Sequence, residues 1–504
     1  MRRRERTSAA LLAACSLLAL AACSPAPGDA GAAAAGHLRM GDIEFEPCSL
    51  STVGASAVEA QCARFEVPED HDAPDGRRIE LALALLPARG QAEPDPVVMI
   101  AGGPGQSALE SYPQVAPAFA DLRRSRNVLL VDARGTGQSH PLNCRDEEGE
   151  NAFGIEDMSE EAQRAFTERC RDALSADSDL RRYGTMDHVR DLERVREALG
   201  VPQLNLVGIS YGTRVAQQYA KAFPASTRTV VIDGVVPNSM VLGQEHARNL
   251  EQALSTQFER CRAESSCVDN LGDPARQLPA VRAALEAADL PAVTYRDPIS
   301  GEWLEERPTF AHLAILLRMF SYQPAAASTL PLLLHDAAEG RYAPLMAQSR
   351  MLMASLGDAM SHGMQLSVIC TEDASEMTVD PGDDGSVLGN DMVAVFQAQC
   401  PAWPTAARAE GFRAPLTGDV PVLAISGEFD PVTPPRYGDE VIAHLPRGRH
   451  LVAPGQGHNV IGAGCMPKLF AQFVERADAE GIDAGCLERL APAPPFAGYY
   501  GWEP

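Results

Sequence analysis

The sequence predicts an α/β fold with a mostly parallel central sheet and an inserted, largely helical lid domain. From residue 41 to 240, short apolar runs of strand length alternate with amphipathic segments of helical period. Residues 241–412 change character, because they are largely helical and show no regular alternation of strands. The strand pattern resumes in residues 413–504. We therefore expect one α/β core built from two parts of the chain, 41–240 and 413–504, with the lid inserted between them.

Short runs rich in Val, Ile and Leu predict the buried strands of this sheet. They span 79–86, 97–101, 127–132, 204–209 and 229–233 in the first part of the core, and 420–425 and 450–453 in the second. Residues 186–199 have the apolar period of an amphipathic helix that packs on a sheet. Within the lid, residues 293–305 predict a single hairpin.

The bulk composition limits the class of protein. The chain has 504 residues and is 45% hydrophobic, which is enough for a globular fold with a large core. Its net charge of −25 argues against a nucleic-acid partner, because phosphate binding requires a basic surface. Nothing in the sequence indicates a metal or an organic cofactor, so we expect neither. The sequence leaves the oligomeric state open.

The first 22 residues have the composition of a signal peptide. Four arginines near the start precede an apolar run, 9–22, which is short for a bilayer span and ends in small residues. Leu20-Ala21-Ala22-Cys23 resembles a bacterial lipobox, in which the cysteine is lipidated and becomes the mature N-terminus. We therefore expect a protein of the bacterial cell envelope, anchored to the membrane through Cys23, with 23–40 as a flexible tether. The alternative is ordinary cleavage near Ala22, which would leave Cys23 free.

If the host has two membranes, the sequence favours the outer membrane or the periplasmic face, since Ser24 lacks the acidic character of an inner-membrane retention signal.

Ten further cysteines follow, and an even number in an exported chain suggests disulfides. None has C-x-x-C spacing, which weighs against zinc and redox sites. Sequence alone does not fix the connectivity; we expect pairing between neighbours along the chain, which would join Cys48 to Cys62, Cys144 to Cys170, Cys261 to Cys267, Cys370 to Cys400 and Cys465 to Cys486.

Residues 208–212, Gly-Ile-Ser-Tyr-Gly, form a G-x-S-x-G motif between a predicted strand and a predicted helix. A nucleophile elbow has this arrangement, because a sharp turn exposes the serine while side chains at the glycine positions would clash with the neighbouring strand and helix. Ser210 is therefore the candidate nucleophile. The alternative is an ordinary glycine-rich turn without chemistry.

Acyl transfer by serine also needs a base and an acid that orients it, and in this type of fold the acid precedes the histidine in the chain. Asp430 follows the predicted strand 420–425 and is the candidate acid, with Glu428 as its substitute. His458 lies in a glycine-containing loop after the strand 450–453 and is the candidate base. His450 and His444 are competitors, but they fall on a strand start and a helix, where a ring is poorly placed to face Ser210.

The oxyanion of an acyl-transfer reaction needs preorganised N–H donors. We expect them from the backbone of Tyr211, which follows the nucleophile, and from Gly103 in the loop 101–107, since Pro104 has no N–H. The alternative is a phosphate-binding loop, but no lysine follows it and the net charge is of the wrong sign.

Together these motifs resemble the prolyl and tripeptidyl aminopeptidase branch of the α/β-hydrolases. The resemblance rests on residues 102–105, 132–139, 208–212 and 427–434, and the segment from Gly464 to Leu487 is similar to the C-terminal segment of the tripeptidyl type. One departure is Ala101, where the family often has a histidine before the Gly-Gly-Pro-Gly. Asp132 and Arg134 belong to the shared motifs, and we interpret them as a structural turn beside the site.

The resemblance implies an aminopeptidase that releases single residues or short peptides from free N-termini of a peptide substrate. Such an enzyme needs a carboxylate for the substrate ammonium, and a blocked N-terminus would leave that carboxylate unpaired. Our candidate is Glu372, late in the lid, and the alternative is that it is a solvated carboxylate. Two other functions stay open: an esterase or lactonase that uses the same residues on small acyl substrates, and a non-catalytic lipoprotein that binds peptides.

Overall fold

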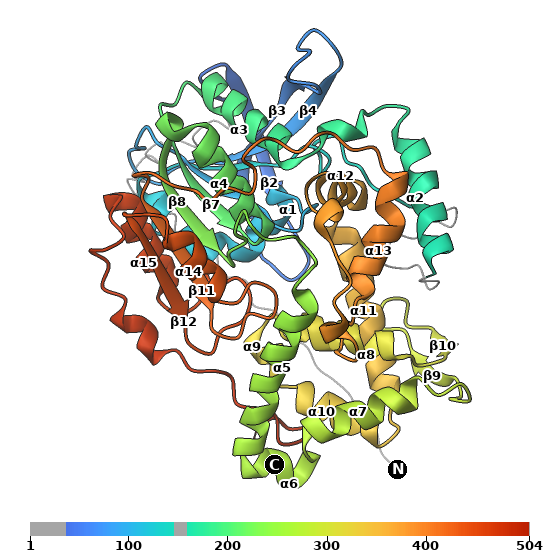
Figure 1. The fold of residues 1–504 in the computed structure, drawn as a ribbon. Coiled ribbons are helices and arrows are strands. Elements are labelled where there is room, and N and C mark those ends of the chain that lie inside the picture. The colour runs from blue at the N-terminus through green and yellow to red at the C-terminus, as the bar shows by residue number, and fades with distance from the viewer. Residues whose placement is uncertain (1–36, 146–158, 503–504) are drawn as a thin grey trace, which may run out of the picture. The chain divides into compact units, whose positions relative to one another are not determined.

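The computed structural model describes residues 37–145 and 159–502 (Figure 1). The predicted signal peptide, the predicted lipidation site Cys23 and most of the predicted tether lie outside these residues. The described chain begins in the sheet, since β1 (Leu38–Met40) pairs antiparallel with β2 (Ile43–Leu50). The ordered sheet therefore starts before residue 40, where we had expected the tether to end.

A ten-stranded sheet forms the centre of the fold, in the order β1-β2-β3-β4-β6-β5-β7-β8-β11-β12. The strands from β1 to β4 pair antiparallel, as do β4 and β6, and the strands from β6 to β12 run parallel. The remaining bounds are β3 (Val58–Pro68), β4 (Arg78–Leu86), β5 (Val97–Ile100), β6 (Val128–Val131), β7 (Leu204–Ile209), β8 (Thr227–Asp233), β11 (Val422–Gly427) and β12 (Gly448–Ala453).

All seven predicted strands are present, and their ends differ from the expected ones by at most two residues. The sequence did not predict β1, β2 and β3. Most residues of β2 and β3 are exposed or half-buried, so these strands lack the continuous apolar run that marks a strand covered on both faces.

Helices cover both faces of the sheet. On one face α3 (Thr185–Leu199) and α4 (Tyr211–Ala222) pack with the strands, and on the other α1 (Ala108–Val115) and α15 (Met466–Arg476) do so. Strand residues alternate between these two cores: Val98 of β5 belongs to the first and Val97 to the second. Helices α2 (Glu160–Leu174) and α14 (Arg436–Ile442) complete the core.

The chain leaves the sheet after β8 and returns at β11, so that these two strands, distant in sequence, lie side by side (Figure 1). The inserted segment contains α5 (His246–Ala263), α6 (Ser265–Leu271), α7 (Pro274–Leu285), α8 (Phe310–Phe320), α9 (Pro324–Ala327), α10 (Leu330–Ala338), α11 (Ala343–Ala359), α12 (His362–Glu372), α13 (Asp391–Gln399) and the hairpin of β9 (Val293–Arg296) and β10 (Trp303–Glu306). Helices α5, α7, α8 and α10 share a hydrophobic core of their own. The exact lid limits, 241 and 412, stay a prediction.

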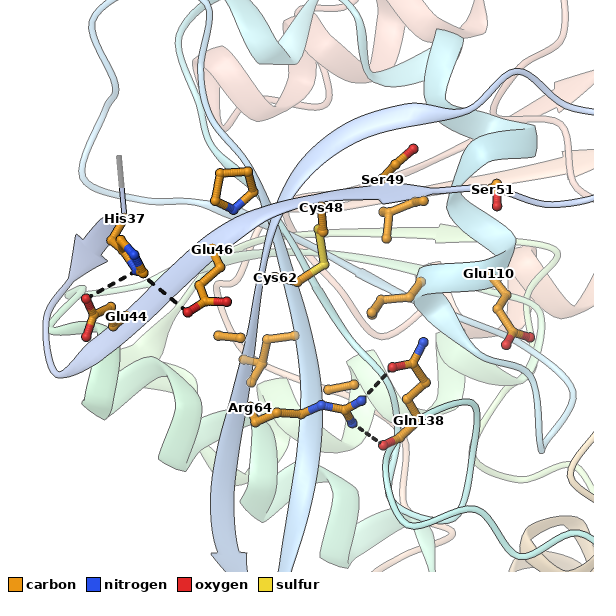
Figure 2. A pocket seen from close by; sticks show the side chains of 16 residues that line it. His37, Glu44, Glu46, Cys48, Ser49, Ser51, Cys62, Arg64, Glu110 and Gln138 are labelled. Carbon is orange, nitrogen blue, oxygen red and sulfur yellow. Dashed lines mark hydrogen bonds and ion pairs between the residues drawn. A yellow bond between two sulfur atoms is a disulfide. The ribbon is translucent and has the colours of Figure 1, made fainter. Parts of the chain in front are cut away.

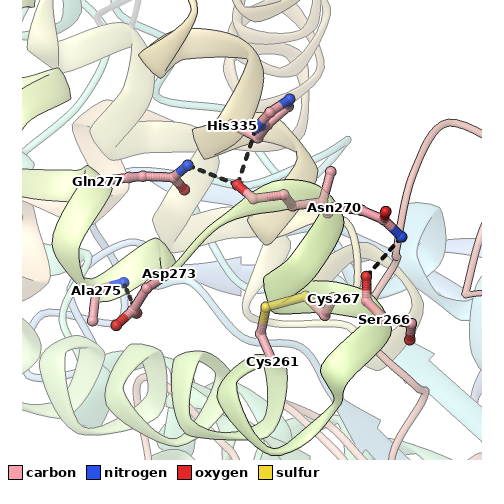
Figure 3. The surroundings of a disulfide bond; sticks show 9 residues. Cys261, Ser266, Cys267, Asn270, Asp273, Ala275, Gln277 and His335 are labelled. Carbon is pink, nitrogen blue, oxygen red and sulfur yellow. Dashed lines mark hydrogen bonds between the residues drawn. A yellow bond between two sulfur atoms is a disulfide. The ribbon is translucent and has the colours of Figure 1, made fainter.

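Five disulfides join each cysteine of the described chain to its neighbour, as expected. The smallest loop is closed by Cys261 and Cys267, which link α5 to α6 (Figure 3). There the Leu271 carbonyl accepts hydrogen bonds from Gln277 and His335, and so ties the end of α6 to α7 and α10. Such a set of disulfides is typical of an exported protein. No helix in the described residues is long and apolar enough to cross a membrane.

Candidate active site

Ser210 lies at the sharp turn between β7 and α4 and adopts φ 54° and ψ −121°. A positive φ is strained for a residue with a side chain, and such strain is kept only where the surroundings enforce it. Here the Ser210 N–H donates to the carbonyl of Asp233 at the end of β8 (2.8 Å). The turn predicted from the motif is therefore present, and Ser210 is half-buried at its tip.

The two glycines of the motif are required by close packing. A Cβ on Gly208 would lie 2.4 Å from the Gly212 carbonyl oxygen, and a Cβ on Gly212 would lie 2.3 Å from the Ile100 carbonyl oxygen. Neither neighbour is a flexible side chain, so any other residue would push α4 away from the strands beneath it. This is the steric reason that the sequence motif predicted.

His458 and Asp430 are in direct contact. The His458 Nδ1 atom lies 2.7 Å from Asp430 Oδ2, and the two residues are only 4% and 2% exposed. Asp430 follows β11 and His458 follows β12, so two adjacent parallel strands deliver them to the same edge of the sheet. The order of acid and base is the one that the sequence analysis expected.

Thr433, which was not predicted from the sequence, completes the surroundings of Asp430. Its N–H donates to Asp430 Oδ1 and its hydroxyl to Asp430 Oδ2, both at 2.8 Å, and the N–H of Val432 also donates to Oδ1 (2.9 Å). A threonine three residues after an aspartate is the signal that could have indicated this turn. The carboxylate is thus fully hydrogen-bonded in the orientation that faces His458.

The electrostatics of the pair favour its charged form. Burial raises the pKa of Asp430, but the charge and hydrogen bond of His458, with backbone N–H donors, bring the pKa below its ordinary value. Burial likewise lowers the pKa of His458, yet Asp430 and, more weakly, Asp233 raise it above its ordinary value. Asp430 therefore stabilises the protonated form of His458, so the neutral ring accepts a proton readily, as a general base must.

The competing candidates have other partners. Glu428 accepts the N–H of Gly455 (2.7 Å), and the His450 ring lies between Asp439 (2.8 Å) and Ser426 (3.0 Å). The structure thus brings Asp430, rather than Glu428, to His458.

Asp233 connects the nucleophile turn with the histidine loop, which the sequence did not predict. Its carbonyl accepts the Ser210 N–H, while its carboxylate accepts the N–H groups of Val460 (2.9 Å) and Ile461 (2.8 Å), two and three residues after His458. Burial is the main cause that raises its pKa to about 6. Ser210 and the loop of His458 are consequently fixed to the same residue.

The predicted oxyanion residues lie on both sides of the nucleophile. Tyr211 is the first residue of α4, where helix geometry leaves the N–H without an intrahelical acceptor. On the other side, a Cβ on Gly102 would lie 3.0 Å from the Ser210 Cβ, so the loop of Gly103 packs against the serine. Gly103 has φ 102°, which favours glycine. Lid residue Ser361 donates its N–H to the Gly105 carbonyl (2.9 Å) and supports this loop.

Glu372 lies at the end of α12 in a buried polar cluster and is only 3% exposed, so it is not the solvated carboxylate of the alternative interpretation. Its two oxygens accept the N–H (2.7 Å) and the hydroxyl (2.8 Å) of Thr185, whose hydroxyl also contacts the Tyr211 hydroxyl (2.6 Å). Arg214 approaches to 3.8 Å. Burial is the main cause that raises the pKa of Glu372 to about 7.

Asp132 and Arg134 make structural contacts. Asp132 accepts the hydroxyl of Ser107 (2.6 Å), which in turn caps the start of α1. Arg134 is fully buried and forms two hydrogen bonds to Asp191, at 2.6 and 2.7 Å. Both therefore hold the loops beside the predicted oxyanion residues, which agrees with the structural role expected for them.

A large groove lies away from these residues. A groove of about 790 Å³ runs along β2 and β3 beside the Cys48–Cys62 disulfide (Figure 2). Its polar groups largely contact one another, because Arg64 bonds Gln138 and His37 lies between Glu44 and Glu46. Ser210, Asp430 and His458 are absent from its lining. In the described residues, no cluster of His, Cys, Asp or Glu could hold a metal ion.

Residues 95–266 match the family model described as alpha/beta hydrolase fold, and residues 385–486 match the model described as TAP-like protein. The chain has the α/β-hydrolase fold, as predicted. The predicted resemblance to the serine peptidase branch of the α/β-hydrolases, with a C-terminal segment of the tripeptidyl aminopeptidase type, is confirmed.

The chain is 27% identical over 483 residues to the serine protease Hip1 of Mycobacterium tuberculosis. This match covers 86% of this chain and 88% of Hip1. It is 32% identical over 222 residues to the tripeptidyl aminopeptidase of Streptomyces lividans, covering 41% of this chain and 40% of that protein. It is also 30% identical over 190 residues to carboxylesterase B of Mycobacterium tuberculosis, covering 35% and 36%. Hip1 is similar along nearly the whole chain, the other two along less than half.

Proposed function

We propose that this α/β-hydrolase is an exported serine aminopeptidase, which releases single residues or short peptides from free peptide N-termini through an acyl-enzyme on Ser210. The observation that carries the proposal is the buried His458–Asp430 pair, whose loop is bound to the same Asp233 that fixes the Ser210 turn. The likeness to Hip1 over most of both chains favours a peptidase.

In the proposed reaction the Ser210 Oγ attacks the scissile carbonyl while His458 takes the hydroxyl proton as general base. Asp430 accepts the hydrogen bond from His458 Nδ1 and stabilises the imidazolium that forms. The N–H groups of Tyr211 and Gly103 stabilise the oxyanion. His458 then gives its proton to the leaving amine, and water releases the acyl group by the same steps in reverse order.

The first test is release of nitroaniline from amino-acid, dipeptide and tripeptide nitroanilides, each with a free and an acetylated N-terminus. We expect cleavage of the free forms only, with the best length identifying the released unit. Ser210→Ala should abolish both this activity and covalent labelling by a fluorophosphonate, and it should unfold at nearly the temperature of the parent. Equal cleavage of acetylated peptides would contradict the aminopeptidase assignment.

We propose Glu372 as the group that recognises the substrate ammonium. Its burial and its raised pKa support the idea that a neighbouring cation would stabilise its charged form. Each Glu372 oxygen accepts one hydrogen bond from Thr185, which leaves acceptor capacity for an ammonium. Glu372→Gln should therefore raise KM for free-amine peptides and spare nitrophenyl butyrate. A parallel loss on the ester would indicate that the residue only supports Tyr211.

The second candidate function is an esterase on small acyl substrates, favoured by the likeness to carboxylesterase B. It would use the same serine, histidine and aspartate. Turnover of nitrophenyl butyrate together with failure to cleave every free-amine nitroanilide would establish it in place of the peptidase.

We also propose that the mature chain is a lipoprotein attached to the envelope membrane through Cys23. The lipobox-like sequence before Cys23 and the five disulfides support export and anchoring. Cys23→Ala should abolish incorporation of labelled palmitate and move the protein from the membrane fraction to the soluble fraction. Unchanged fractionation and no palmitate in the parent would contradict it.

A further inference from the structure

Arg318 lies in the last turn of α8 in the lid, and the end of that helix packs directly on the loop of His458. The Tyr322 carbonyl, just beyond α8, accepts the His458 N–H (2.9 Å), and the two rings meet edge to face with centroids 5.0 Å apart. A Cβ on Gly457 would lie 2.2 Å from the same carbonyl oxygen. Arg318 is therefore carried on an element that contacts the catalytic loop.

The partners of Arg318, which include the Tyr322 hydroxyl, are uncharged. Its guanidinium donates to the Met392 sulfur (3.2 Å), and its other terminal nitrogen is 3.5 Å from His246 Nδ1. Burial, with the charge of Arg318, lowers the pKa of His246 to about 3, so that ring is neutral. A thioether and a neutral imidazole bring no negative charge to a guanidinium.

Three other arginines of the lid form ion pairs with carboxylates. Arg248 pairs with Asp380 (2.7 Å), Arg341 with Asp336 (2.7 Å) and Arg282 with Glu286 (3.1 Å). Within the described residues, Arg318 forms no ion pair with a carboxylate, although the chain carries a net charge of −25. It is also half-buried beside His458, where a charge pair is stronger than on an open surface.

We propose that Arg318 is a specificity residue that binds a carboxylate of the substrate beside the acyl site. Guanidinium binds carboxylate through two parallel hydrogen bonds, and such charge-assisted bonds are the strongest in proteins. The carboxylate belongs either to the C-terminus of a short peptide or to an acidic side chain. The proposal rests on the proposed reaction at Ser210 and His458.

Two pairs of substrates distinguish the two sources of carboxylate. The first pair is tetra-alanine as the free acid and as the C-terminal amide; the second is Ala-Ala-Glu and Ala-Ala-Gln nitroanilide. We expect the parent to prefer the acidic member of one pair by about tenfold or more in kcat/KM. Arg318→Gln should remove that preference while it retains activity on the neutral member, and Arg318→Lys should keep part of it. Arg248→Gln, which removes a paired lid arginine, should leave the preference unchanged.

A pH profile adds a second readout that a structural role would not change. Burial lowers the pKa of His458, Asp430 and Asp233 raise it, and the charge of Arg318 lowers it more weakly. The ring also faces Tyr322 and the neutral His246. A bound carboxylate neutralises the charge of Arg318, so the acidic limb of kcat should lie at higher pH for the anionic substrate than for the neutral one. In Arg318→Gln the acidic limb for the neutral substrate should itself move to higher pH, because the positive charge near His458 is gone.

The same experiments separate the role of Arg318 from the aminopeptidase activity. A parent that cleaves the peptides without charge preference in either pair, or a preference that survives in Arg318→Gln, overturns the role of Arg318 alone. If no peptide is cleaved, the aminopeptidase is wrong, and nitrophenyl butyrate against the nitrophenyl half-ester of succinate then decides the role of Arg318. Fluorophosphonate labelling of each variant verifies that the site is folded.

Discussion

One neighbouring residue, Asp233, stabilises the strained backbone conformation of Ser210. Asp233 accepts the Ser210 N–H through its carbonyl and the N–H groups of Val460 and Ile461 through its carboxylate. The carboxylate is completely buried, which is costly unless its acceptor sites are filled. At the scale of single residues, then, Asp233 positions the two segments that contain the residues proposed for the reaction, and it raises the pKa of His458.

We expect Asp233→Asn to lower kcat/KM about tenfold or more, since the amide nitrogen of asparagine would face a backbone N–H instead of accepting it. Loss of the negative charge should also lower the pKa of His458, so that the acidic limb of kcat/KM moves to lower pH. The measurement is a pH–rate profile on the best free-amine nitroanilide.

Asp95→Asn is the matched control, because Asp95 is also buried and paired, with Arg126 at 2.9 Å, but lies at the opposite end of the strands. It should change stability and leave the position of the acidic limb in place. An acidic limb unmoved in Asp233→Asn would show that Asp233 has no electrostatic role.

At the scale of elements, the decisive contact is that of α4 with β5. Gly212 lies so close to the Ile100 and Ala101 carbonyls that a Cβ would be 2.3 and 2.6 Å from their oxygens. This close approach places the first turn of α4, with the Tyr211 N–H, beside the oxyanion loop that follows β5. Lid residue Ser361 then supports that loop from the other side.

We expect Gly212→Ala to destabilise the fold by about 1–3 kcal/mol, the usual cost of overpacking, and to reduce activity further by moving the Tyr211 N–H. Gly200→Ala is the control, since Gly200 ends α3 with φ 68° and nothing within 4 Å of its Cβ position. That variant should lose about 1 kcal/mol from backbone strain alone and keep full activity per folded molecule. Urea unfolding and nitroanilide turnover separate the two effects, and equal activity of the variants would contradict the role of the contact.

At the scale of the whole molecule, buried ionisable groups give stability opposite dependences on pH. Burial raises the pKa of Asp233 to about 6 and of Glu372 to about 7, so their contribution is present at low pH and is lost as pH rises through these values. Burial lowers the pKa of His188 and His362 to about 4, and their contribution is lost as pH falls below about 6.5. Because both sets of groups titrate between about pH 4 and 7, their opposite effects on stability offset each other within that range.

Glu372→Gln tests the first of these contributions. Because the folded state keeps Glu372 protonated up to about pH 7, the parent should lose stability relative to the variant between pH 4.5 and 7. The difference should be on the order of 3 kcal/mol in the free energy of unfolding. Urea unfolding of both proteins at pH 5 and 8 measures it, and parallel changes in the two proteins would show that the carboxyl is not protonated in the fold.

The sequence by itself determined the strands from β4 onward, the helical insertion and the residues proposed for the reaction, whereas the pairing of neighbouring cysteines was an expectation that the structure decided. Local patterns sufficed for these, since apolar runs, glycine spacing and chain order are properties of short segments. Tertiary structure alone decided that β1 to β3 extend the sheet, that Asp233 joins the Ser210 turn to the His458 loop, and that Glu372 is buried behind Tyr211. It also brought Arg318 of the lid beside His458. These facts depend on contacts between segments far apart in the chain, and no local pattern of residues specifies which distant groups meet.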